Sequence, residues 1–127
     1  HSGGNATLTA TANIVNHTDF FMNDTTSITA EGNIELTATL GSMIVRSITS
    51  NNGDISMTAA ETIIPWNKNI TSTNGSLTIN ALTFSTDNST INAKNGVNIT
   101  TTETTNSSIY LDSTSSIESN GIINLIA

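Results

Sequence analysis

The sequence predicts an all-β fold: a right-handed parallel β-helix (β-solenoid) of five to six coils, with about 21 residues and three short strands per coil. Three observations indicate this fold. One unit recurs six times at a nearly constant step, apolar and polar residues alternate within the units, and Asn-Gly pairs recur inside them. We expect the whole chain, residues 1–127, to form a single β-solenoid domain without visible end caps.

Each repeat begins with an apolar anchor residue, followed by small polar residues and an apolar-polar-apolar triplet. The six anchors are spaced by 20, 20, 22, 21 and 26 residues. Equivalent residues of successive coils stack at the strand spacing of ~4.8 Å, so we expect inner ladders. The structural core ladder contains the anchors Leu8, Ile28, Ile48, Ile70, Ile91 and Ile117. Two further ladders contain Ile14, Ile34, Ile55, Leu77, Val97 and Ile123, and Leu36, Met57, Ile79, Ile99 and Leu125.

Corner turns are predicted at the four Asn-Gly pairs, which are Asn52 and Gly53, Asn74 and Gly75, Asn95 and Gly96, and Asn120 and Gly121. Both residue types tolerate positive φ, where a β-branched residue would be strained. A further apolar cluster between repeats, such as Met43-Ile44-Val45, predicts the third strand of each coil. Two excursions from the rod are expected, at the polar residues 100–108 and at residues 65–68, because Pro65 cannot donate to an interior ladder.

An antiparallel sandwich is the alternative fold, since Asn-Gly between alternating strands is also a strong hairpin signal. A sandwich needs no constant period, however, and it usually buries larger aromatic residues between two facing sheets. Aromatic residues make up only 4% of this chain. The regular step therefore favours the solenoid, and the absence of a hexapeptide repeat favours right-handed winding.

Composition excludes several classes of function. The chain contains 24 Thr, 18 Asn and 16 Ser, and its net charge of −7 includes only three Lys and Arg residues. It lacks the basic surface that neutralises phosphates, so we expect no binding to nucleic acid. No apolar run approaches the ~20 residues that span a bilayer, so we expect no membrane insertion. The chain has no cysteine, and its Thr, Asn and Ser content favours an extracellular location, secreted or on the cell surface.

Catalytic patterns are missing from the sequence. There is no Ser-His-Asp order, phosphate loop or HExxH motif, so we expect no enzyme and no catalytic, cofactor or metal site. Glycoside cleavage needs two carboxylates ~5–10 Å apart. Glu31 and Asp54 fall near successive corners and could be neighbours, although solvated turns explain them more simply. His17, Asp19 and Asp24 are too scattered for us to expect a divalent-ion site.

Trp66, the only tryptophan, lies two residues before Lys68. These two residues are a candidate partner contact for a host glycan or surface, whereas the simpler interpretation is that the indole packs over the side of the rod. Outward threonine rows are also expected, at Thr29, Thr49, Thr71 and Asn92 and at Thr37, Thr58 and Asn80. Because such rows are typical of ice-binding solenoids, a binding module for ice or glycans is the alternative function.

Three segments carry a resemblance to a known family. They are Gly32-Asn-Ile-Glu-Leu-Thr-Ala38, Gly53-Asp-Ile-Ser-Met-Thr-Ala59 and Gly75-Ser-Leu-Thr-Ile-Asn-Ala81. They resemble the repeats of filamentous-haemagglutinin-type proteins, which are two-partner-secreted bacterial exoproteins and adhesins. The resemblance extends from about Leu8 to Ala127, without the amino-terminal secretion domain of such exoproteins. It implies an extracellular stalk or adhesive fibre.

The sequence remains apolar to its last residues, Gly121-Ile-Ile-Asn-Leu-Ile-Ala127, with no amphipathic helix or charged tail. A solenoid with free ends exposes unpaired strand edges and therefore needs polar caps. We expect either that copies stack end to end by strand addition into a homo-oligomer or filament, or that the rod continues in an adjoining solenoid. The predicted function is a non-enzymatic structural module of an extracellular bacterial surface fibre or adhesin.

Overall fold

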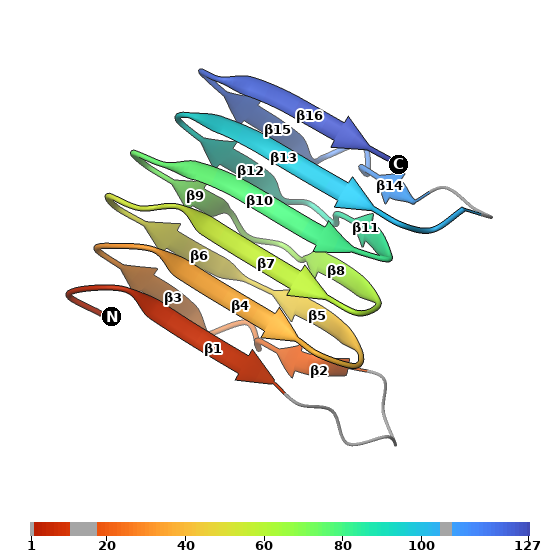
Figure 1. Ribbon diagram of the computed structural model, residues 1–127, viewed down its shortest axis with the longest axis horizontal. Helices are drawn as coiled ribbons and strands as arrows, with labels where there is room; N and C mark the ends of the chain where they lie inside the picture. The colour runs from red at the N-terminus through yellow and green to blue at the C-terminus, as the bar shows by residue number, and fades with distance from the viewer. Residues whose placement is uncertain (1, 11–17, 105–107) are drawn as a thin grey trace.

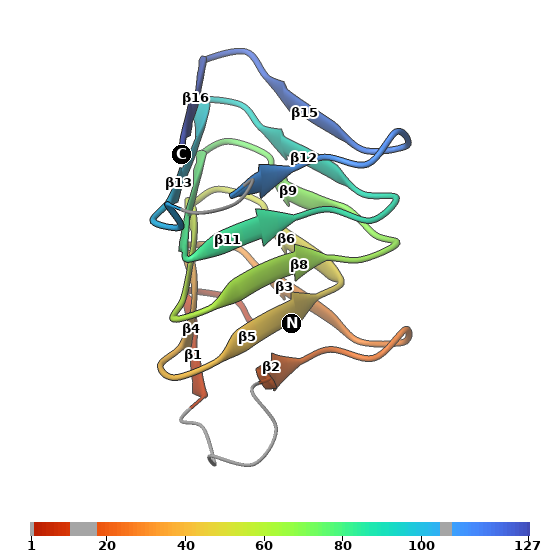
Figure 2. The same cartoon turned by 90° about the vertical axis from the view of Figure 1, so that its right-hand side faces the viewer.

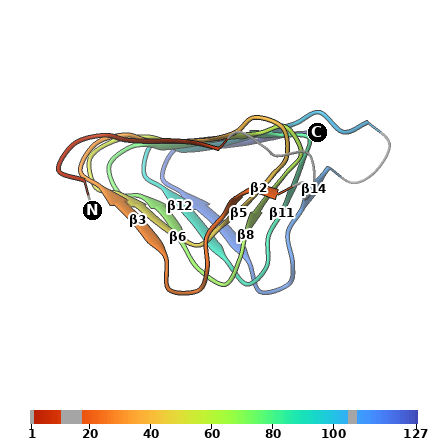
Figure 3. The ribbon, with the colours of Figure 1, turned by 90° about the horizontal axis from the view of Figure 1, so that it is seen from below.

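The computed structural model describes residues 2–10, 18–104 and 108–127, in which sixteen strands form three parallel sheets. The sheets enclose a triangular cross-section, seen along the rod in Figure 3. The chain visits the three sheets in the same order in every coil and winds in the right-handed sense (Figure 1). The predicted β-solenoid is therefore confirmed, with about five turns of ~22 residues.

Each sheet takes one strand from every coil. The broad sheet contains β1 (Ala6–Ala10), β4 (Ile34–Ala38), β7 (Ile55–Ala59), β10 (Ser76–Ala81), β13 (Gly96–Thr101) and β16 (Ile122–Ile126). The second sheet contains β2 (Thr18–Phe21), β5 (Ser42–Val45), β8 (Thr62–Pro65), β11 (Thr83–Ser85) and β14 (Ile109–Tyr110). The third sheet contains β3 (Ser27–Ala30), β6 (Ser47–Ser50), β9 (Ile70–Ser72), β12 (Thr90–Ala93) and β15 (Ser116–Ser119).

Apolar side chains at equivalent positions stack inside the rod. Strand pairing in the third sheet places Ile28, Ile48, Ile70, Ile91 and Ile117 in one ladder. The broad sheet contributes the ladder of Ile34, Ile55, Leu77, Val97 and Ile123 and the ladder of Leu36, Met57, Ile79, Ile99 and Leu125. Away from the ends these side chains are buried, because alternate residues of each strand point inward.

The prediction that Leu8 begins the core ladder is wrong. Leu8 pairs with Leu36, so it lies in the broad sheet and not beside Ile28. An apolar-polar-apolar triplet has the same alternation in every sheet, so the pattern alone does not show which sheet a strand joins. Ile14 lies outside the described residues, and Ala6 is the residue that pairs with Ile34.

The second sheet is formed by the apolar clusters between the repeats, as predicted. Figure 2 shows its strands β2, β5, β8 and β11 stacked along the rod. Their inward residues form a fourth ladder, which contains Phe20, Met43, Ile63, Phe84 and Ile109. Phe84 and Met43 are among the largest fully buried side chains, so this ladder fills the third side of the triangle.

The Asn-Gly corners join the third sheet to the broad sheet, but positive φ is not the general reason for their glycines. Among these four corners only Gly96 has positive φ, at 146°. The common reason is close stacking of the backbone. A Cβ atom on Gly75 would lie 2.2 Å from the carbonyl oxygen of Gly53, and one on Gly121 would lie 2.1 Å from that of Asn95.

Buried serine hydroxyls satisfy backbone groups on the inner side of these corners. The Ser50 hydroxyl oxygen lies 2.8 Å from the carbonyl oxygens of Gly32 and Gly53 and accepts the Gly53 N–H at 3.0 Å. The Ser72 hydroxyl donates to the Gly53 carbonyl at 2.8 Å. No buried side-chain polar atom of the described residues is left without a hydrogen-bond partner. Polar residues thus enter the interior only where the backbone turns.

The two predicted excursions begin later than expected. Pro65 is the last residue of β8, where it pairs with Val45 and its carbonyl accepts the Asp87 N–H at 3.1 Å. Proline is tolerated there because the strand ends. Thr100 and Thr101 belong to β13, so the second excursion begins at residue 102, and residues 105–107 lie outside the described residues.

We predict that Gly75→Ala destabilises the fold by about 1–3 kcal/mol, because the new methyl group would meet rigid backbone. Urea unfolding followed by circular dichroism measures the change. Gly4→Ala is the matched control, since a Cβ atom there would have no neighbour within 4 Å. Equal losses for the two variants would contradict the close-stacking explanation.

Candidate functional site

The predicted partner contact lies at the corner between the second and third sheets. Trp66 directly follows β8 and forms a parallel bridge with Asp87 of the next coil. Trp66 is 36% exposed, and Lys68 is exposed as well. The guanidinium of Arg46, from the preceding coil, stacks over the indole at 4.5 Å from the ring centroid. The ring therefore packs against the rod with one face covered.

Arg46 is the one residue between β5 and β6, and its side chain is buried. Its Nη1 donates to the Trp66 carbonyl at 2.8 Å, and its Nε donates to the Met22 carbonyl at 3.3 Å. Its Nη2 pairs with Asp24 Oδ1 at 2.6 Å. One arginine therefore joins three successive coils. Sequence reasoning missed this cluster, although Asp24, Arg46 and Trp66 follow one another at the coil step of 22 and 20 residues.

The broad sheet has six strands, one more than either other sheet, and these strands overlie one another almost in a line in the end view (Figure 3). Outward residues form two columns along the rod. The first contains Thr7, Glu35, Ser56, Thr78, Asn98 and Asn124, and the second contains Thr9, Thr37, Thr58, Asn80, Thr100 and Ile126. Hydroxyl and amide groups therefore recur on this face at the strand spacing of ~4.8 Å.

The rows expected from the sequence lie on two different sheets. Thr37, Thr58 and Asn80 are in the second column of the broad sheet. The row of Thr29, Thr49, Thr71 and Asn92 follows the third sheet. Because both faces carry such rows, threonine content alone does not single out one binding face.

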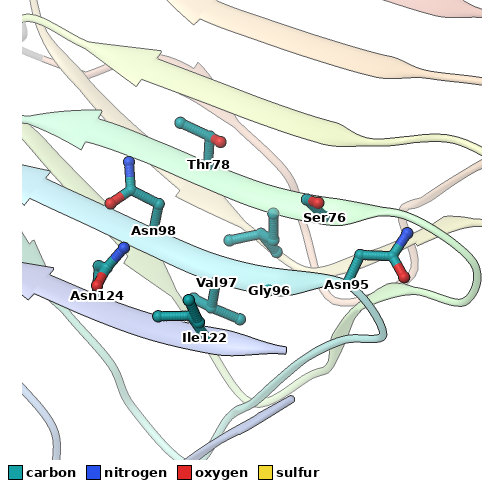
Figure 4. Close-up of a pocket in the computed structure, with 9 residues that line it drawn as sticks. Ser76, Thr78, Asn95, Gly96, Val97, Asn98, Ile122 and Asn124 are labelled. Atoms are coloured by element: carbon teal, nitrogen blue, oxygen red, sulfur yellow. The ribbon is translucent and has the colours of Figure 1, made fainter. Parts of the chain in front are cut away.

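A shallow hollow of about 200 Å³ interrupts the broad sheet at Gly96. Gly96 lies in register between Ser76 and Ile122 and has no side chain, so the hollow opens above it (Figure 4). Polar side chains of Thr78 and Asn98 line its edge. Ligand pockets usually measure roughly 300–1,000 Å³, so this hollow is smaller than a typical ligand pocket.

The hollow coincides with the end of a side-chain ladder along the corner. Asn5 Oδ1 accepts the Asn33 N–H at 2.9 Å, and Asn33 Oδ1 accepts the Asp54 N–H at 2.9 Å. Asp54 Oδ1 then accepts the Ser76 N–H at 2.7 Å. Asp54 is the last side-chain acceptor of this ladder, and Ser76, which it binds, pairs with Gly96 at the hollow. The end of the ladder and the hollow therefore lie at the same corner.

The carboxylates singled out as a candidate acid pair have separate structural partners. Glu31 accepts the side-chain amides of Asn51 and Asn52, at 2.8 and 3.3 Å. Asp54 accepts the backbone N–H of Ser76 in the following coil. Both groups therefore act as hydrogen-bond acceptors at corners.

The structure describes only part of the group of His17, Asp19 and Asp24, for which the sequence predicted no divalent-ion site. His17 and the side chain of Asp19 lie outside the described part of the chain, and Asp24 is paired with Arg46. Within residues 2–10, 18–104 and 108–127, no three His, Asp or Glu residues gather in a way that could hold a metal ion.

Among the acids whose side chains the structure describes, Asp112 is the one with a strongly shifted pKa. It follows β14, and its carboxylate accepts hydrogen bonds from the Ser115 and Thr114 hydroxyls and from the Asn88 N–H. These bonds, that of Ser115 foremost, lower the pKa of Asp112 from 3.8 to about 2. The charged form therefore organises the turn that leads into β15.

Fold and surface together define the chain as a parallel β-solenoid protein whose broad and third sheets have polar outer faces. No family model, curated protein or solved structure matches it. The resemblance to filamentous-haemagglutinin-type repeats therefore stays a prediction. In the described part of the chain, no helix has the length and apolar character needed to cross a membrane.

We predict that Arg46→Met lowers the free energy of unfolding by about 2–3 kcal/mol, because charged hydrogen bonds to two carbonyls are lost. The emission of Trp66 should shift to longer wavelength as its covered face becomes hydrated. Since Trp66 is the only tryptophan, the fluorescence spectrum reports this site alone. Lys68→Met is the control and should change neither quantity. An unshifted spectrum for Arg46→Met would refute the stacking.

We predict that Asp112 contributes to stability at neutral pH and that this contribution disappears between about pH 4 and pH 2. The folded state has the lower pKa, so on acidification the unfolded chain binds the proton first and is stabilised relative to the folded state. Urea unfolding of wild type and Asp112→Asn across this range should show a stability difference that shrinks as the pH falls. The exposed Asp87→Asn serves as the control, and a difference independent of pH would contradict the prediction.

Proposed function

We propose that this domain is a non-enzymatic structural segment of an extracellular bacterial fibre or adhesin stalk, in which further coils cover its two ends. The covering coils belong either to an adjoining solenoid or to a second copy. The domain then acts as a rigid spacer, whose length is set by the number of stacked coils at ~4.8 Å each.

The observation that carries this proposal is the contrast between the last coil and the one before it. Ile99 is 0% exposed, whereas its stacking partner Leu125 is 46% exposed. At the other end, Leu36 is buried and its partner Leu8 is 39% exposed. Inward-facing apolar residues are thus exposed at both ends of the ladder, and another coil in register would bury them.

The sides of the rod differ from its ends. Along the corners, side-chain amides and carboxylates of one coil bind the backbone of the next, as Asn33 binds Asp54. The outer faces of the broad and third sheets are dominated by hydroxyl and amide groups, whereas the second sheet also exposes Phe21 and Tyr110. This difference supports growth along the axis, because strand edges and apolar surface are both available there. The extracellular placement rests on the resemblance to secreted exoproteins and on the Thr, Asn and Ser content.

Extension of the rod tests this proposal directly. Thr100 pairs with Ile126, so Ala127 follows in the register of Thr101. A second copy of residues 102–127 attached after Ala127 should therefore enter the rod in register and raise the melting temperature. The matched control carries Asp at the attached copies of Ile117 and Leu125. If the two extended chains melt at the same temperature as the original, the ends need no covering coil and the proposal fails.

Electron microscopy and sedimentation over a concentration series then identify the covering coil. Uniform filaments of the original chain, lost in Leu125→Lys and kept in Asn124→Lys, would identify a second copy. Dispersed particles together with stabilisation by the extension would identify an adjoining solenoid. Dispersed particles without that stabilisation would favour the alternative function as an ice- or glycan-binding module.

A further inference from the structure

The four Asn-Gly corners share a chemical reactivity that goes beyond the proposed structural role. In an Asn-Gly sequence the backbone nitrogen of glycine can attack the side-chain Cγ of asparagine, because glycine has no side chain in the way. Hydroxide takes the N–H proton, a bond forms between this nitrogen and Cγ, and the side-chain nitrogen takes a proton from water and leaves as ammonia, which regenerates hydroxide. Water then opens the cyclic imide to aspartate or isoaspartate.

Three of the corners hold the asparagine side chain in place. The Asn52 side-chain amide donates to Glu31 Oε2 at 3.3 Å. The Asn74 amide donates to the Asn51 carbonyl at 2.8 Å and to Asn52 Oδ1 at 3.2 Å. The Asn95 amide donates to the Asn74 carbonyl at 3.0 Å. Each amide is thus tied to the preceding coil, and its Cγ cannot rotate onto the following glycine nitrogen unless these bonds open.

The fourth corner lacks this restraint. Asn120 is exposed, and its side chain makes no hydrogen bond to any described residue. The Gly121 N–H donates to the Ser119 hydroxyl oxygen at 3.0 Å. The Gly53 N–H donates to the Ser50 hydroxyl oxygen at the same distance. The backbone nitrogens of these two corners are therefore alike, and the difference between them lies in the asparagine side chains.

We infer that Asn120 deamidates fastest among the four Asn-Gly sites, while stacking of the amides protects Asn52, Asn74 and Asn95. The modification adds one negative charge two residues from Glu118, at the corner that leads into β16. Formation of isoaspartate also inserts an extra backbone carbon into that corner. Both changes fall on the last coil, whose pairing depends on the close approach of Gly121 to Asn95.

Peptide mapping by mass spectrometry tests the inference on the folded chain incubated at mildly alkaline pH. Asn120 should convert at least about tenfold faster than the other three asparagines, because packed corners must open before they react. In urea, where no corner is folded, all four should convert at similar rates. Equal rates in the folded chain, or faster conversion of Asn52, Asn74 or Asn95, would overturn the inference.

A second variant separates protection by the amide bond from simple burial. Glu31→Ala removes the acceptor of the Asn52 amide and should accelerate deamidation of Asn52, while leaving Asn95, whose amide binds the Asn74 carbonyl, unchanged. Circular dichroism of this variant establishes that it remains folded. If Asn52 in the folded variant reacts no faster than in wild type, the side-chain bond is not the protecting feature. The readout is independent of filament formation, so it does not depend on the proposed function.

Discussion

In-register stacking is the constraint on which the rest of this structure depends. Every strand pairs with the equivalent strand of the next coil, so each residue contacts its own counterpart about one strand spacing away. The residue at each position must therefore pack well against the equivalent residues of the neighbouring coils as well as against the interior. Isoleucine suits a filled interior, glycine suits a corner where backbones nearly touch, and asparagine suits a corner where one coil must bind the next. Arg46 shows that a single long side chain can link three coils, through hydrogen bonds and an ion pair.

The repeat in the sequence predicted much of this arrangement, because in-register stacking requires similar residue types at a regular spacing along the chain. The isoleucine anchors from Ile28 onward and the third strand of each coil could be predicted for that reason. Leu8 could not be placed, since its alternation suits any of the three sheets and only its pairing with Leu36 decides between them. The φ-based explanation of the glycines also failed, because the distance to the neighbouring backbone is a property of two coils together.

The surface features were less accessible to sequence reasoning. The cluster of Arg46 and Trp66 joins residues of different local pattern, so only the coil step connects them in the sequence. The hollow at Gly96 follows from one residue that lacks a side chain within a column of polar ones. A corner glycine looks the same in the sequence whether or not it opens such a hollow. Regular positions could therefore be predicted from the sequence, whereas exceptions to the regularity had to be seen in the structure.

The direction of the backbone hydrogen bonds has a mechanical consequence. In a solenoid these bonds run from coil to coil, along the axis of the rod rather than across it. Tension applied to the two ends therefore loads the interfaces between coils in series, and the weakest interface limits the strength of the whole rod. Side-chain bonds between coils, such as those of Asn33 and Arg46, act in parallel with the backbone at their own interfaces. Tensile strength would thus vary along the rod, even though the backbone pattern is uniform.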